Sequence, residues 1–193
     1  GTYSETDTPS GNITFSANGI FSSATTITTT GTVTVAAGKT LAINNGAATP
    51  LDADFTHTSG TTAVNGELKA LSINLGTTTV NGNGARITGN SITTGTITGT
   101  ADNTDELILT SATGSFTTGQ AGTPAISFKK LTFDAGLSAD LTFSDKNLYT
   151  NALELKIDDS KKLILNGTIS ITGSGGFVSP LKSDSTPFPV ELS

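Results

Sequence analysis

Three residue types are missing from the 193-residue sequence: Cys, Met and Trp. Without Cys the chain can form no disulfide, no thiolate metal site and no cysteine nucleophile. Histidine and arginine occur once each, as His57 and Arg86. Ten Lys and Arg against sixteen Asp and Glu give a net charge of -6, so there is no basic footprint for nucleic acid. No apolar run approaches the roughly 20 residues of a membrane-spanning helix, and no transmembrane segment is expected.

Charge and helical periodicity are also scarce. Charged residues make up only 13% of the chain, and Thr alone accounts for about one residue in five. No window of about 11 residues keeps an apolar helical stripe without Gly or β-branched interruptions. Low charge, absence of Cys and abundant Thr, Asn and Gly together predict an extracellular or cell-surface bacterial protein.

Alternation of apolar and polar residues is the main signal that is present. Short segments with one apolar face, bounded by Gly, Asn or Asp, recur along the chain and predict an all-β protein. Thr fills many alternate positions, and its β-branched side chain suits an extended backbone. The expected core includes Val33, Val35, Leu41, Ile43, Leu155, Ile157, Leu163 and Leu165.

Two pairs of similar segments indicate a repeating unit. Residues 33–43 and 155–165 carry apolar side chains at the same four offsets, and both lead into Asn and Gly. Residues 61–66 and 77–82 share the pattern T-T-x-V-N-G. Very short strands after tight polar corners are typical of a parallel β-helix, or β-solenoid, in which successive coils stack about 4.8 Å apart. The alternative is a β-sandwich (jelly-roll) filament subunit, although sandwiches usually have longer strands.

The pattern divides the chain into three parts. Residues 1–11 form a polar N-terminal arm, residues 12–173 the β-solenoid domain, and residues 174–193 a C-terminal arm rich in Gly and Pro. In the second arm Phe188, Val190 and Leu192 alternate with Pro and Glu, so they point the same way from an extended segment. Proline restricts such a segment to the edge of a sheet. These three residues are therefore the candidate assembly contacts.

The motif V-x-V-x-x-G-x-x-L-x-I-x-N in residues 33–45 resembles the coils of bacterial autotransporter passengers and filamentous-haemagglutinin-like surface proteins. The Thr/Asn/Gly-rich stretch 77–103 is similar to those coils in composition. The resemblance covers residues 12–173 and is one of pattern, without a signature motif. It implies a right-handed parallel β-helix that is exported and serves adhesion or assembly instead of catalysis.

Residues that could carry chemistry are few. His57 stands alone among Thr residues and is expected to face solvent on a strand, so no catalytic triad is expected. The acidic segments 52–54 and 102–106 lack the spacing of known calcium loops and are expected to be corner residues. Asp134, Asp140 and Asp145 flank apolar strands and could meet as glycosidase carboxylates, but caps at strand ends explain them equally well. We predict no catalytic residue, no metal site and no cofactor.

Threonine rows are the remaining candidate feature. Thr94, Thr96, Thr98 and Thr100 are expected to align on one face of a strand, and regular Thr arrays on a flat solenoid face can order water. The Thr runs cluster in the first hundred residues without a fixed coil spacing, which argues against an ice-binding protein.

The sequence thus favours an extracellular structural protein, not an enzyme, that assembles with itself into a surface filament, fibre or layer. The physical basis is that a solenoid ends in an unpaired strand at each end. An adhesin segment that binds surface glycans is the main alternative. A secreted carbohydrate-active enzyme and an ice-binding protein are further alternatives.

Overall fold

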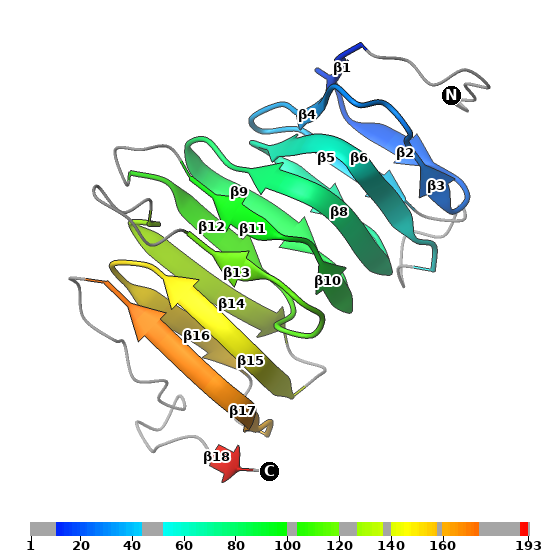
Figure 1. Cartoon of the computed structure of the whole chain (residues 1–193). Coiled ribbons are helices and arrows are strands. Elements are labelled where there is room, and N and C mark those ends of the chain that lie inside the picture. The colour runs from blue at the N-terminus through cyan, green and yellow to red at the C-terminus, as the bar shows by residue number, and fades with distance from the viewer. Residues whose placement is uncertain are drawn as a thin grey trace.

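The computed structural model describes residues 11–43, 52–99, 104–119, 127–136, 140–157, 160–173 and 190–192. These residues form eighteen β-strands in two sheets and no helix. Figure 1 shows the two sheets as layers whose strands stack along one axis, from β1 at the N-terminal end to β17 at the C-terminal end.

The larger sheet, here sheet A, has eleven strands. They are β1 (Ile13–Phe15), β3 (Thr25–Thr26), β4 (Thr32–Val35), β6 (Phe55–Val64), β8 (Ser72–Thr79), β10 (Ser91–Thr93), β11 (Thr96–Thr98), β13 (Thr117–Thr118), β15 (Leu141–Tyr149), β17 (Leu163–Thr172) and β18 (Val190–Leu192). Sheet B has seven: β2 (Gly19–Phe21), β5 (Thr40–Ile43), β7 (Glu67–Lys69), β9 (Asn83–Thr88), β12 (Glu106–Leu109), β14 (Lys130–Gly136) and β16 (Leu153–Ile157).

Every strand pairing of the described chain is parallel, and each strand pairs with one from the preceding or following coil. The chain therefore winds as a β-solenoid of about six turns, which confirms the predicted fold class. The jelly-roll alternative is wrong for the described residues because a jelly roll is built from antiparallel strands.

The core lies between the two sheets and consists of the inward-facing residues of both. Val33, Val35, Leu41 and Ile43 are fully buried, and Leu155 and Leu163 are buried as well. Ile157 and Leu165 are partly buried against this core. The alternation of apolar residues thus predicted the core correctly, since only one side of each strand faces the opposite sheet.

The two repeats found in the sequence have different meanings in the structure. Residues 61–63 and 77–79 lie directly opposite each other in adjacent coils, so this repeat marks one full coil. Residues 33–43 run from sheet A to sheet B, whereas residues 155–165 run from sheet B to sheet A. The two matching segments therefore form corners on opposite sides of the solenoid, and they do not occupy equivalent positions in their coils.

A pentapeptide repeat with unequal spacing along the chain is aligned by the pairing of the strands. G-N-I-T-F, G-T-V-T-V, G-T-T-A-V, G-T-T-T-V and G-T-I-T-G begin at residues 11, 31, 60, 76 and 95. Pairing of β1, β4, β6, β8 and β11 places them side by side in five successive coils. Their glycines form a column in which a side chain on Gly31, Gly60 or Gly76 would meet backbone of the preceding coil. Gly is required there by close approach of the coils.

Side chains of Asn and Asp connect coils at the corners and, in one case, at the bulge of β15. In each case a side-chain oxygen accepts the backbone N–H of a residue about one coil away. The pairs are Asn12 with Thr32, Asn18 with Thr40, Asp54 with Ser72, Asp105 with Gly82, Asp140 with Lys162, and Asp145 with Thr168. These bonds satisfy N–H groups at positions where the strand ladder is interrupted.

Most residues of the two predicted arms lie outside the described residues. The exceptions are Gly11 and β18, and β18 pairs with the beginning of β17 in the same chain: Val190 lies opposite Leu163, and Leu192 opposite Leu165. Phe188 lies outside the described residues. Since the described residues contain no helix, they also contain none that could cross a membrane.

Candidate functional site

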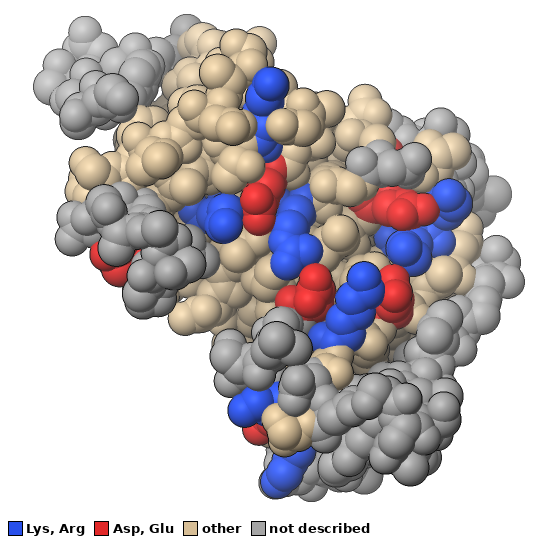
Figure 2. All heavy atoms as spheres, turned by 180° about the vertical axis from the view of Figure 1, so that it is seen from behind, with Lys and Arg blue, Asp and Glu red and all other residues tan. Residues whose placement is uncertain are grey.

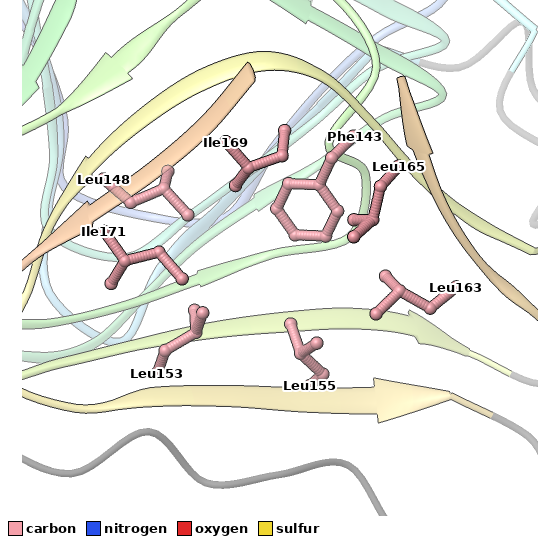
Figure 3. A pocket seen from close by; sticks show the side chains of 8 residues that line it. All are labelled: Phe143, Leu148, Leu153, Leu155, Leu163, Leu165, Ile169 and Ile171. Carbon is pink, nitrogen blue, oxygen red and sulfur yellow. The ribbon is translucent and has the colours of Figure 1, made fainter. Parts of the chain in front are cut away.

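The C-terminal end of the solenoid is hollowed between its last strands. The hollow has a volume of about 220 Å³. Its lining is entirely apolar and comes from β15, β16 and β17: Phe143, Leu148, Leu153, Leu155, Leu163, Leu165, Ile169 and Ile171. Figure 3 shows these side chains pointing toward one another from the two sheets. We call this feature the C-terminal hollow.

Exposure of apolar side chains rises at both ends of the solenoid. In the described part of the chain, five apolar residues pack on the core while remaining partly exposed, and all lie in β1, β16 or β17: Ile13, Phe15, Ile157, Leu165 and Ile169. Large apolar side chains with high exposure are Ile20 in β2, at 65%, and Ile171 in β17, at 44%. Among the described residues of the interior coils, no further large apolar side chain is highly exposed, because each coil is covered by a coil above and below.

The backbone is open at the same places. β1 is the first strand of sheet A, and β2 and β16 are the two outer strands of sheet B. β18 covers only residues 163–165 of β17, so among the described residues no strand pairs with the remainder of its outer edge. Both ends of the described solenoid thus present unpaired N–H and C=O groups next to apolar side chains.

The N-terminal end has an aromatic pair where the C-terminal end has its hollow. The rings of Phe15 and Phe21 meet edge to face with centroids 5.8 Å apart. Phe21 is buried, while Phe15 and Ile13 keep part of their surface exposed. The two ends are therefore different surfaces.

The acidic segments serve the corners. Asp54 accepts the backbone N–H of Ser72, and the buried Asp105 accepts that of Gly82. Glu106 binds Lys129, with 2.9 Å between Nζ and Oε1, and this hydrogen bond together with the charge of Lys129 and Lys130 lowers the pKa of Glu106. No group of three or more potential metal ligands occurs among the described residues. Asp102 lies outside them.

The three aspartates considered as glycosidase carboxylates have separate partners. Asp134 forms an ion pair with Arg86 on the outer face of sheet B, at 3.2 Å. Asp140 accepts the backbone N–H of Lys162, just before β17, and Asp145 accepts that of Thr168 within β17. Only Asp140 lies at a strand end as a cap, whereas Asp134 lies within β14 and Asp145 at the bulge within β15.

His57 is buried, and the expectation that it faces solvent is wrong. It follows Phe55 at period two in β6 and therefore points into the core with it. Its Nε2–H donates a hydrogen bond to the carbonyl of Thr29 at 3.1 Å. In the neutral ring Nδ1 then carries no proton, and it accepts a hydrogen bond from the hydroxyl of Thr62 at 2.8 Å. Burial lowers the pKa of His57, and the bond to Thr29 opposes this shift only in part. Both ring nitrogens are thus engaged in structural bonds.

A buried lysine was not predicted from the sequence. Lys146 follows Asp145, whose φ of 43° marks a bulge in β15 where the register shifts. The bulge reverses the alternation and turns Lys146 inward, where Nζ donates to the carbonyls of Gly114 and Ser144 at 2.6 and 2.7 Å. The ammonium also lies 4.8 Å from the ring centre of Phe116. Burial lowers the pKa of Lys146, with the charge of Asp145 opposing.

Charged side chains collect on the outer face of sheet B, where Figure 2 shows acidic and basic groups intermingled. They form a ladder of ion pairs across successive strands: Lys69–Glu67, Arg86–Glu67, Arg86–Asp134, Lys129–Glu106, Lys130–Glu106, Lys130–Glu154 and Lys156–Glu154. Each of these nine groups has a partner of opposite charge, and five cations against four anions leave the ladder with a net charge of only +1.

Comparison with known proteins adds no relative. No protein-family model, curated protein or solved structure matches the chain.

Proposed function

We propose that this protein is an extracellular structural subunit that assembles end to end into a filament or layer. The observation that carries the proposal is the confinement of partly exposed core residues to the first and last coils. Such residues need a further coil to complete their burial, and a second copy can supply it. Low charge and the absence of Cys support the proposed location outside the cell.

Head-to-tail stacking of subunits provides pairing partners for the outer strands of both sheets. The next subunit places β1 beyond β17 and β18 in sheet A, and β2 beyond β16 in sheet B. All strands then remain parallel, and the apolar residues Ile13 and Phe15 close the C-terminal hollow. Since the two ends are different surfaces, the contact is heterologous and repeats without closing, which yields a filament. β18 stands at the edge that the next subunit meets, so Val190 and Leu192 stay predicted assembly contacts.

The test compares two charge substitutions in β17. Ile171→Asp puts a carboxylate into the C-terminal hollow, whereas Ser170→Asp puts the same charge one residue away on the exposed outer face. Light scattering over a concentration series and negative-stain microscopy should show filaments for the unmodified chain and for Ser170→Asp. We expect Ile171→Asp to remain monomeric with an unchanged β circular dichroism spectrum. A chain that stays monomeric at all concentrations, or equal assembly of both variants, would refute the proposal.

A further inference from the structure

The outer face of sheet A carries a regular array of threonines over five coils. It consists of the second and fourth residues of each pentapeptide, which project outward. The second residues are Asn12, Thr32, Thr61, Thr77 and Thr96, and the fourth are Thr14, Thr34, Ala63, Thr79 and Thr98. We call these ten positions the threonine array. Thr117, opposite Thr96, continues the first column into the next coil.

The array has fixed spacings in two directions. Neighbouring coils repeat at about 4.8 Å, and alternate residues of one strand lie about 6.6 Å apart. The positions are held from below, since the third residues Val33, Thr62, Thr78 and Ile97 are fully buried. The glycine column beside the array keeps adjacent coils in close contact. The hydroxyls thus form a lattice with two repeated spacings on a backbone that has little freedom to rearrange.

The hydroxyls of the array are available to solvent molecules. Among its threonines, only Thr98 donates to a protein group in the described chain, a 3.5 Å bond to the carbonyl of Thr78. Thr77, at the centre, is exposed. No array position is charged, while the charged ladder occupies the opposite sheet. The surface is therefore neutral, and it suits a neutral, hydrogen-bonding lattice.

We propose that the threonine array binds ice. Hydroxyls at repeated spacings hold water in a two-dimensional order, and the neighbouring methyl groups restrict the positions that this water takes. A crystalline polysaccharide is disfavoured as the partner because none of the ten array positions is a Phe or Tyr that could serve as a stacking platform. The unequal coil spacings do not weaken the array, since the strand register aligns the threonines independently of coil length.

The experiment measures thermal hysteresis and inhibition of ice recrystallisation by the purified chain. Thr77→Tyr interrupts the centre of the array with a bulky ring. Thr142→Tyr makes the same change in β15, which belongs to sheet A but lies outside the array. We expect ice activity in the unmodified chain and in Thr142→Tyr, and its loss in Thr77→Tyr with an unchanged melting temperature.

Two results would overturn the inference: absence of ice activity in the unmodified chain, or equal loss in both tyrosine variants. If Thr77→Tyr fails to fold, Thr77→Lys provides the same test with a flexible side chain. Measuring the Ile171→Asp variant separates this inference from the proposed assembly, because a monomer that retains ice activity shows that the array acts without filaments.

Discussion

Gly60 lies against the carbonyl oxygen of Gly31 in the preceding coil, and a Cβ atom on Gly60 would collide with that oxygen. The same column contains Gly95, where a Cβ atom would lie 3.6 Å from the carbonyl oxygen of Gly76, an ordinary contact. The two positions therefore provide a matched pair for measuring how tightly the coils stack.

We expect Gly60→Ala to lower the free energy of unfolding by about 1–3 kcal/mol, the usual cost of forcing atoms into a packed site. Gly95→Ala should have little effect, because its methyl group has room. Urea denaturation of the two variants checks the difference. Equal stability of both would show that adjacent coils can separate without cost.

The hydroxyl of Thr118 is buried and meets no hydrogen-bond partner in the described structure. The hydroxyls of Thr78 and Thr94 bond to each other at 2.9 Å. Val has nearly the same shape as Thr, so Thr118→Val should leave the melting temperature unchanged or raise it. Thr78→Val should lower the free energy of unfolding by about 1 kcal/mol, since it breaks a buried bond. A fall in stability for Thr118→Val would reveal a partner for its hydroxyl.

Stability should depend on pH through His57. Burial lowers the pKa of His57 in the folded chain, so the unfolded chain binds the proton more tightly. The stabilisation is complete above the unfolded value of about 6.5 and decreases as the pH falls below it toward the folded pKa. Urea denaturation at intervals between pH 8 and pH 5 is the measurement.

His57→Gln is the control, because the chain contains no other histidine. The free energy of unfolding of the unmodified chain should decrease between pH 8 and pH 5 because His57 binds a proton, and the variant should lack this contribution. It should also be less stable at neutral pH by about 1–3 kcal/mol, since the bonds to Thr29 and Thr62 change. An identical pH dependence in both chains would contradict the prediction.

The corner bonds between coils can be tested at Asp140, whose side chain accepts the backbone N–H of Lys162 at 2.9 Å. Asp140→Ala removes the acceptor and should lower the free energy of unfolding by about 1 kcal/mol. Asp140→Asn retains a side-chain oxygen and should recover most of this loss. If the Asn variant is as unstable as the Ala variant, the contribution comes from the charge and not from the hydrogen bond.

Alternation predicted which faces of the strands form the core, because one side of each strand must face the opposite sheet. Alternation predicts which residues of a strand face the core only where the strand is regular. The bulge at Asp145 turns Lys146 inward, and the bend at Gly95 separates the buried Thr94 from the outward Thr96, so these threonines do not form the single row that we expected. Thr100 lies outside the described residues.

The burial of His57 was predictable in principle from Phe55, two residues before it on the same strand. The pentapeptide array was not, because its five copies are separated by connections of unequal length. Only the pairing of strands, which depends on the folded chain, shows that these copies are neighbours. The C-terminal hollow is lined by three consecutive strands, β15, β16 and β17, and it follows from their placement in the two facing sheets rather than from any sequence motif.

Residues 61–63 pair with residues 77–79, so residues 61–76 form one complete coil that can be repeated as a unit. Its first residue stands directly beneath the residue that follows its last, and it includes the sheet B strand β7. A tandem copy inserted after Gly76 would add one rung to each sheet without altering either end. The size of the molecule can thus be changed in steps of a single coil, and its surfaces widened while the terminal contacts stay the same.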